Sequence, residues 1–130
     1  MRKLVLIVAA AALALSAGQA LAAKKQLVII VKGLDNPYFE LMHQGCLKWN
    51  KENPDSDYEC AYTGPASTSD EAGEAQIVGD ILSKPDTAGI AISPSNAPLI
   101  AQTLRTSGPT VPVMTVGADR RTGDAGLRQR

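Results

Sequence analysis

The chain has 130 residues, with 13 lysines and arginines balanced by 13 aspartates and glutamates, so its formal net charge at pH 7 is zero. This balance gives no electrostatic case for nucleic-acid binding, which needs a basic surface. His43 is the only histidine, and neither of the two cysteines has a second thiol close by in the sequence, which disfavours a metal site.

Residues 1–22 predict a secretory signal peptide. Arg2 and Lys3 precede an apolar run from residue 4 to 15, and the segment ends Ala-Leu-Ala at 20–22, with small residues where a signal peptidase reads. A membrane-spanning helix would need roughly 20 continuous apolar residues, and polar residues interrupt this run. We therefore expect cleavage after Ala22, a periplasmic product and no direct membrane insertion. Cleavage removes two basic residues and no acidic one, which leaves a net charge of −2.

Residues 26–49 predict the first strand and helix. Leu27 to Val31 is an apolar, β-branched run without alternation, which is typical of a strand buried on both faces of a parallel sheet. A short loop from Lys32 to Pro37 follows. Apolar residues at spacings of three and four then predict a helix that packs on the sheet. These residues are Tyr38, Leu41, Met42, Gly45, Cys46 and Trp49.

Three more strands and two more helices follow in alternation. The strands are expected at residues 58–63, 88–92 and 111–116. Thr68 and Glu71 fit a capping box that opens the second helix. The loop at 93–96 caps the third helix, with Gly108 just past the end of that helix. Right-handed crossovers would join the strands into a doubly wound parallel α/β sheet with strand order 2-1-3-4.

Several motifs recur at the ends of these strands. Lys32 follows the first strand, and Asn-Pro-Tyr-Phe at 36–39 opens the helix. Tyr-Thr-Gly-Pro at 62–65, Ile-Ala-Ile-Ser-Pro at 90–94 and Val-Pro-Val-Met-Thr-Val at 111–116 lie at or after the later strands. In this order the motifs resemble the opening of periplasmic sugar-binding proteins, the solute receptors of ABC importers. The likeness covers residues 26–119 and implies the N-terminal, Rossmann-like lobe of the type 1 periplasmic binding protein fold.

The resemblance also implies a function. A protein of this kind is the solute-binding component of an ABC transporter: it binds a small sugar or sugar-like ligand without a cofactor and presents it to a permease in the inner membrane. Ligands of parallel α/β sheets bind at the carboxyl ends of the strands. The expected binding residues are therefore Lys32, Asn36, Tyr38, Phe39, Ser93, Asn96 and Asp119.

The roles of these residues come partly from chemistry and partly from the resemblance. Sugar hydroxyls need directional donors and acceptors, and the apolar faces of sugars stack on aromatic rings. By resemblance, Asn36, Tyr38 and Phe39 match the motif whose ring lines the sugar cleft. Lys32 matches a ligand-contacting lysine of receptors for rhamnose-like sugars and the furanosyl autoinducer. The residues alone leave alternatives open. Phe39 could be a core residue, Asn36 a helix cap, and Lys32 a solvated lysine at the end of a strand.

The loop after the fourth strand departs from the family pattern. Receptors of the rhamnose and autoinducer subgroup show Asp-Ser-Asp there, whereas this chain has Gly117, Ala118 and Asp119. Asp119 keeps one acceptor for paired sugar hydroxyls. The missing acid at Gly117 leaves the identity of the ligand open.

Cys46 and Cys60 have two possible states. Cys46 lies on the apolar stripe of the first helix, and Cys60 lies in the second strand, which should run beside the first. An oxidising compartment would let the two cysteines pair if their Cα atoms come within about 7 Å. The alternative is two reduced thiols that pack as small apolar groups.

Residues 23–119 are expected to form the ligand-binding lobe, and residues 120–130 a polar tail or an interrupted continuation. Because receptors of the resembled family close two lobes around the ligand, a lone lobe should bind sugars weakly or not at all. Two alternatives are an exported ligand sensor that feeds a chemoreceptor or histidine kinase, and a non-functional truncated receptor. An enzyme is not expected, because one histidine gives no Ser/His/Asp set and Ser93 lacks the flanking glycines of a nucleophile elbow.

Overall fold

A computed structural model describes residues 23–117. The predicted signal peptide, Asp119 and the residues from 120 to 130 therefore lie outside the described residues. Four strands alternate with three α-helices, and a short 3-10 helix, η1 (Pro37–Phe39), precedes the first of them. The strands are β1 (Lys25–Ile30), β2 (Tyr58–Thr63), β3 (Thr87–Ile92) and β4 (Val113–Thr115); the helices are α1 (Glu40–Glu52), α2 (Glu71–Ser83) and α3 (Ala97–Ser107).

All the strand pairs are parallel, and the order across the sheet is β2-β1-β3-β4. This arrangement confirms the predicted fold class and strand order. β1 is central, with Leu27 paired to Cys60 of β2 on one side and to Gly89 of β3 on the other. The apolar run of β1 predicted a strand buried on both faces of the sheet. Only one face is fully buried: Val28 and Ile30 lie in the core, whereas Leu27 on the opposite face is 39% exposed.

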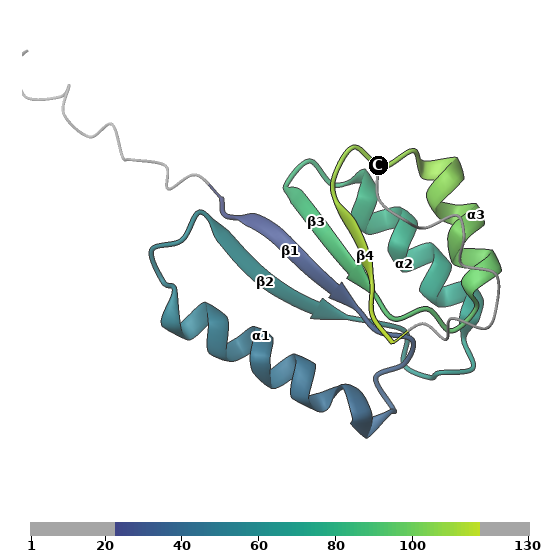
Figure 1. Cartoon of the computed structure of the whole chain (residues 1–130), viewed down its shortest axis with the longest axis horizontal. Helices are drawn as coiled ribbons and strands as arrows, with labels where there is room; N and C mark the ends of the chain where they lie inside the picture. The colour runs from purple at the N-terminus through teal and green to yellow at the C-terminus, as the bar shows by residue number, and fades with distance from the viewer. Residues whose placement is uncertain (1–22, 118–130) are drawn as a thin grey trace, which may run out of the picture.

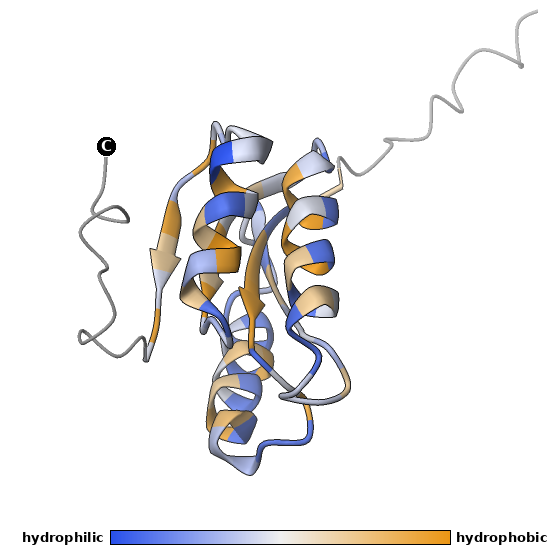
Figure 2. Ribbon diagram, turned by 90° about the vertical axis from the view of Figure 1, so that its right-hand side faces the viewer, coloured by the Kyte–Doolittle hydropathy of each residue, from blue (hydrophilic) through white to orange (hydrophobic). Residues whose placement is uncertain are grey.

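The helices cover the two faces of the sheet unequally (Figure 1). Helices α2 and α3 lie together on one face, whereas α1 lies on the other face beside β2. Hydrophobic residues gather on the sheet and on the inward sides of the helices in Figure 2. The core lies between the sheet and the α2–α3 pair and contains Val28, Ile30, Val78, Ile90, Ile92, Ile100 and Leu104.

The face that α1 turns to the sheet differs from the predicted stripe. Tyr38 and Leu41 are 73% and 82% exposed, whereas Cys46 is buried. His43 stacks on Tyr62 of β2 with ring centroids 4.6 Å apart. The side-chain amide of Asn50 donates to the carbonyl of Cys60 and accepts from its N–H, both at 2.8 Å.

The physical reason is the position of β2 at the edge of the sheet. An edge strand leaves backbone donors and acceptors without a neighbouring strand, and the polar side chain of Asn50 satisfies two of them. The apolar spacing therefore placed the helix and part of its inward face: Met42, Cys46 and Trp49 are buried or half-buried as predicted, whereas Tyr38 and Leu41 are exposed. Polar contacts to the edge strand turn His43 and Asn50 toward the sheet and turn Tyr38 and Leu41 away from it.

The capping box predicted for α2 is wrong. The helix begins at Glu71, and its N-cap is Asp70, whose side chain accepts a hydrogen bond of 2.9 Å from the N–H of Gly73. Thr68 instead donates its N–H and hydroxyl to Asp35, two loops away in the sequence. Glu71 accepts from the side chain of Asn96. Contacts between loops therefore take the groups that a local cap would have used.

Candidate functional site

The carboxyl ends of the four strands all lie at the same end of the sheet, because the strands are parallel. We call the segments at this end of the sheet the rim, defined as residues 31–39, 64–70, 93–96 and 116–117. Ladder hydrogen bonds carry the sheet into these loops: Val31 N–H donates to Thr63, Ser93 N–H to Ile30 and Val116 N–H to Ile92, at 2.8 to 2.9 Å. The rim is thus a direct continuation of the sheet.

Asp35 ties the first rim loop to the second. One oxygen of its carboxylate accepts the N–H of Thr68 at 3.0 Å and the hydroxyl of Thr68 at 2.8 Å. Close by, the N–H of Leu34 donates to the carbonyl of Pro65 at 2.9 Å. Gly33 makes this approach possible, because a Cβ atom there would overlap the backbone nitrogen and hydroxyl of Thr68. The two loops are therefore held as one unit.

The Thr68 hydroxyl that donates to Asp35 lowers the pKa of this carboxyl below its ordinary value. A lowered pKa in the folded state means that the charged form stabilises the fold. That stability is fully present above the ordinary pKa of about 3.9 and is lost as the pH falls through the lowered pKa. We expect Asp35→Asn to reduce the melting temperature slightly at pH 7, with the difference from wild type disappearing in acid. Thermal unfolding of both proteins from pH 2 to 7 measures this, and a constant difference at all pH values would contradict it.

Asn36, Tyr38 and Phe39 take different positions at the rim. The side-chain oxygen of Asn36 accepts the N–H of Tyr38 at 3.0 Å, so Asn36 caps η1 with its oxygen. The ring of Tyr38 is 73% exposed. Phe39 is 2% exposed and lies in the core, as in the alternative that the residues had left open. The two rings meet edge to face with centroids 5.1 Å apart, so Phe39 supports Tyr38 from below.

Lys32 lies two residues beyond β1 and is half-buried. Among residues 23–117, no carboxylate forms an ion pair with it; Lys48 pairs with Glu52, and the ring of His43 lies 3.8 Å from the carboxylate of Glu40. Its charged head is therefore not neutralised by a neighbouring side chain in the described part of the chain.

Tyr62 anchors the start of the helix below the rim. Its hydroxyl donates to the carbonyl of Phe39 at 3.4 Å, and its ring stacks on His43. Burial, and next the negative charge of Glu40, raise the pKa of Tyr62. Tyr62 therefore stays neutral as a donor and holds the η1 turn at the end of β2.

The third and fourth rim loops lie next to each other. Ser93 is 4% exposed, and a Cβ atom at Gly117 would lie 3.8 Å from its hydroxyl oxygen. Asn96 is the N-cap of α3: its side chain accepts the N–H of Leu99 at 3.0 Å and donates to Glu71 at 2.7 Å. The structure thus brings Ser93 to the rim beside Gly117, whereas the polar groups of Asn96 are taken up by contacts within the chain.

Glu74 is the rim-supporting residue that the sequence reasoning missed. It is fully buried on α2, and its carboxylate accepts hydrogen bonds from Ser95 in the third rim loop. A signal was present, because Glu74 lies four residues before the buried Val78 and so shares the inward face of the helix. An acid on that face indicates a buried polar contact.

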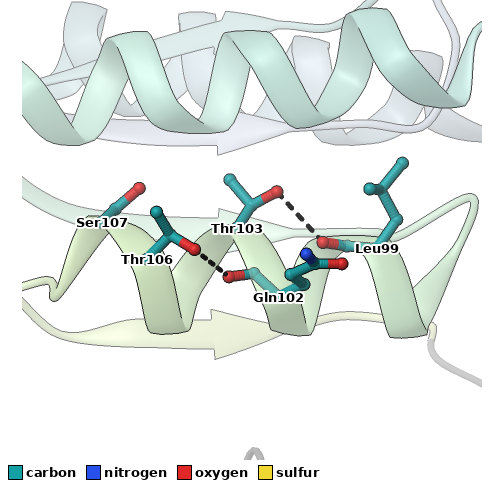
Figure 3. A pocket seen from close by; sticks show the side chains of 5 residues that line it. All are labelled: Leu99, Gln102, Thr103, Thr106 and Ser107. Carbon is teal, nitrogen blue, oxygen red and sulfur yellow. Dashed lines mark hydrogen bonds between the residues drawn. The ribbon is translucent and has the colours of Figure 1, made fainter.

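A separate shallow groove runs along α3 (Figure 3) and is lined by Leu99, Gln102, Thr103, Thr106 and Ser107. The hydroxyls of Thr103 and Thr106 donate to carbonyls of the same helix, at 3.0 and 3.1 Å. All the lining residues belong to one helix and none belongs to the rim. The groove therefore has no converging polar groups of the kind found in ligand sites.

The described part of the chain, residues 23–117, contains no cluster of three or more metal-ligating side chains. Over the same residues, no helix combines the length and apolar character that crossing a bilayer requires.

Comparison with solved structures finds related folds. LsrB from Clostridium saccharobutylicum, in complex with AI-2, has a TM-score of 0.61 and 22% identity over 72% of this chain and 28% of its own. A periplasmic solute-binding protein of an ABC transporter from Actinobacillus succinogenes 130z, with bound D-allose, has a TM-score of 0.53 and 21% identity over 69% and 30%. The periplasmic component of an ABC-type sugar transport system from Hahella chejuensis has a TM-score of 0.54 and 22% identity over 72% and 35%.

The match is one of fold. No protein-family model matches the chain, and no curated protein matches it either. The chain spans about a third of the length of the solved structures, 28% to 35% in these three. The resemblance found in the sequence is confirmed at this level: the described residues have the α/β fold of part of the periplasmic sugar-binding proteins of ABC transporters.

Proposed function

We propose that this chain is the solute-binding component of an ABC transporter, or a lobe of one, and that it binds a small sugar or sugar-like ligand at the rim. The observation that supports the proposal is that segments from all four strands converge at the carboxyl end of the sheet. The exposed ring of Tyr38 lies among them. Two solved proteins of this fold carry D-allose and AI-2 in their structures.

The rim offers the chemistry that a sugar needs. The ring of Tyr38 is an exposed aromatic face for the apolar side of a sugar. The amide nitrogen of Asn36, the ammonium group of Lys32 and the hydroxyl of Ser93 are hydrogen-bond donors. Asp119, outside the described residues, would add an acceptor. Phe39 acts through its edge contact with Tyr38 and not as a stacking surface of its own.

Hydrogen bonds that fix the rim loops in place also support the proposal. Asp35 holds the first two loops together, and α2 holds the third. A binding surface whose loops are already fixed loses less conformational entropy when a ligand arrives, which favours affinity. The rim is therefore suited to a small, rigid, polar ligand.

The proposal extends to a second lobe and a permease, which the likeness in fold to the solute-binding proteins supports. A second lobe would complete the cleft and close over the ligand by a hinge motion, and the closed form would dock on a permease from the periplasmic side. One lobe alone would supply only about half of the contacts to the ligand. Of weak binding and no binding, the proposal requires weak binding by the 130-residue chain alone, with a Kd on the order of 1 mM, which corresponds to about −4 kcal/mol.

Calorimetric titration with D-allose, D-ribose and AI-2 tests this function, with Tyr38→Ala as the main variant. Losing the stacking surface should weaken binding by roughly three- to tenfold, because aromatic contacts contribute about 0.5 to 1.5 kcal/mol beyond area burial. Tyr58→Ala is the matched control, because Tyr58 is also exposed but begins β2 at the opposite end of the sheet. Equal losses in both variants, or no binding by wild type at any sugar concentration, would overturn the proposal. Micromolar binding by wild type would overturn its two-lobe part.

A further inference from the structure

Glu74 is an acid with no access to solvent. It is 0% exposed, in the first turn of α2, on the face that the helix turns to the core. One carboxylate oxygen accepts the N–H of Ser95 at 2.8 Å and also accepts the hydroxyl of Ser95. Among the described residues, the other oxygen has no hydrogen-bond partner.

Such a group is unfavourable for the stability of the fold. A buried polar atom without a partner loses its hydration and gains nothing in return. Val78, four residues further along and on the same helix face, is a fully buried core residue, so an apolar residue at position 74 would also suit this layer. Residues that break the rules of core packing are expected mainly where function requires them. The position of Glu74 therefore points to a role outside core stability.

That role is visible in what Glu74 holds. Ser95 lies two residues after Ser93 and directly before Asn96, the N-cap of α3. Asn96 is itself held by Glu71, one turn away from Glu74 on α2. Two acids of α2 thus accept hydrogen bonds from two consecutive residues of the third rim loop. The buried one is Glu74, which accepts from both the backbone and the side chain of Ser95.

We propose that Glu74 is a positioning residue for ligand binding: it fixes the loop from Ser93 to Asn96 on α2 and so holds the Ser93 hydroxyl beside Gly117 at the rim. The inference rests on the proposed function, since it assigns Glu74 to that same site. Without the carboxylate, the N–H and hydroxyl of Ser95 lose their acceptor. The loop must then be ordered when the ligand binds, and affinity falls.

Two variants of Glu74 separate positioning from packing. Glu74→Gln keeps a side-chain oxygen that can accept from Ser95, whereas Glu74→Met keeps the length of the side chain and has no oxygen. Amide hydrogen exchange of the full chain, measured without ligand, reports on the loop directly. We expect exchange at Ser95 to rise at least about tenfold in Glu74→Met and to stay within about twofold in Glu74→Gln. Exchange at the core strands β1 and β3 should not change in either variant.

Ser95→Ala is a milder test that leaves the core untouched. It removes the hydroxyl donor and keeps the N–H, so exchange in the loop should rise by a smaller factor, about threefold. Unchanged exchange at Ser95 in Glu74→Met would overturn the inference. So would equal effects of the Gln and Met variants, or a rise that spreads evenly over the whole sheet.

Sugar affinity forms the second arm of the experiment. Titration at the rim should show about tenfold weaker binding for Glu74→Met and rescue to within about twofold for Glu74→Gln. Full affinity in Glu74→Met would overturn the inference. If wild type binds no sugar, the proposed function fails instead, while the exchange arm still decides whether Glu74 fixes the loop.

Discussion

Replacing Cys46 and Cys60 by alanine is expected to lower the free energy of unfolding by about 3 kcal/mol. In the structure the two sulfur atoms are bonded, at 2.00 Å, with Cα atoms 5.4 Å apart, so of the two states considered for these cysteines the structure has the disulfide. The bond closes a loop across a sequence separation of 14 residues, and cross-linking a loop of about 15 residues restricts the unfolded chain by about 3 kcal/mol. For a domain of this size the melting temperature should fall by roughly 10 to 20 °C.

The disulfide joins α1 to the edge strand β2, so its loss should also loosen the attachment of this helix to the sheet. Denaturant unfolding with and without reductant measures the loss. Reductant should destabilise the wild type and leave the double alanine variant unchanged. Equal stability of the oxidised wild type and the double variant would contradict the account of how α1 is attached.

Replacing Gly33 by alanine is expected to destabilise the chain and to separate the first two rim loops. A Cβ atom at this position would overlap the backbone nitrogen and hydroxyl of Thr68 and would lie 2.6 Å from the carboxylate of Asp35. Because one of these atoms is backbone, the loops themselves must shift. Overpacking of this kind costs about 1 to 3 kcal/mol, and here it also breaks the hydrogen bonds between Asp35 and Thr68.

Gly45→Ala is the matched control. Gly45 lies inside α1, and apart from its chain neighbours and the backbone of its own helix no atom of the described residues lies within 4 Å of the position that its Cβ would take. Alanine favours a helix interior over glycine by up to about 1 kcal/mol, so this variant should be slightly stabilised. Thermal unfolding and sugar titration of both variants test the pair. The rim account is contradicted if Gly33→Ala keeps full stability and full affinity.

The fold could be predicted because its main determinants are local. The apolar runs of β1 and β3 and the alternation with helices specify a parallel sheet, and the handedness of crossovers then leaves few possible strand orders. The full inward face of α1 could not be predicted from apolar spacing, which identified Met42, Cys46 and Trp49 but not Asn50. It depends on polar contacts between Asn50 and the edge strand, which are set by tertiary structure.

In the site, too, the positions of residues could be predicted but their tertiary contacts could not. The strand ends located the rim, and Lys32, Asn36, Tyr38 and Ser93 lie there as expected of that position. Their individual environments were not predictable. The cap made by Asn36, and the burial of Glu74 under Ser95, depend on loops that meet only in the folded chain.

If the rim is the ligand-binding face, the amide chemical shifts that change most during a sugar titration should lie at residues 33–38 and 93–96, in the segments that follow β1 and β3. Shifts confined to the groove from Leu99 to Ser107 on α3, or to the opposite edge of the sheet around Tyr58 and Thr87, would contradict it.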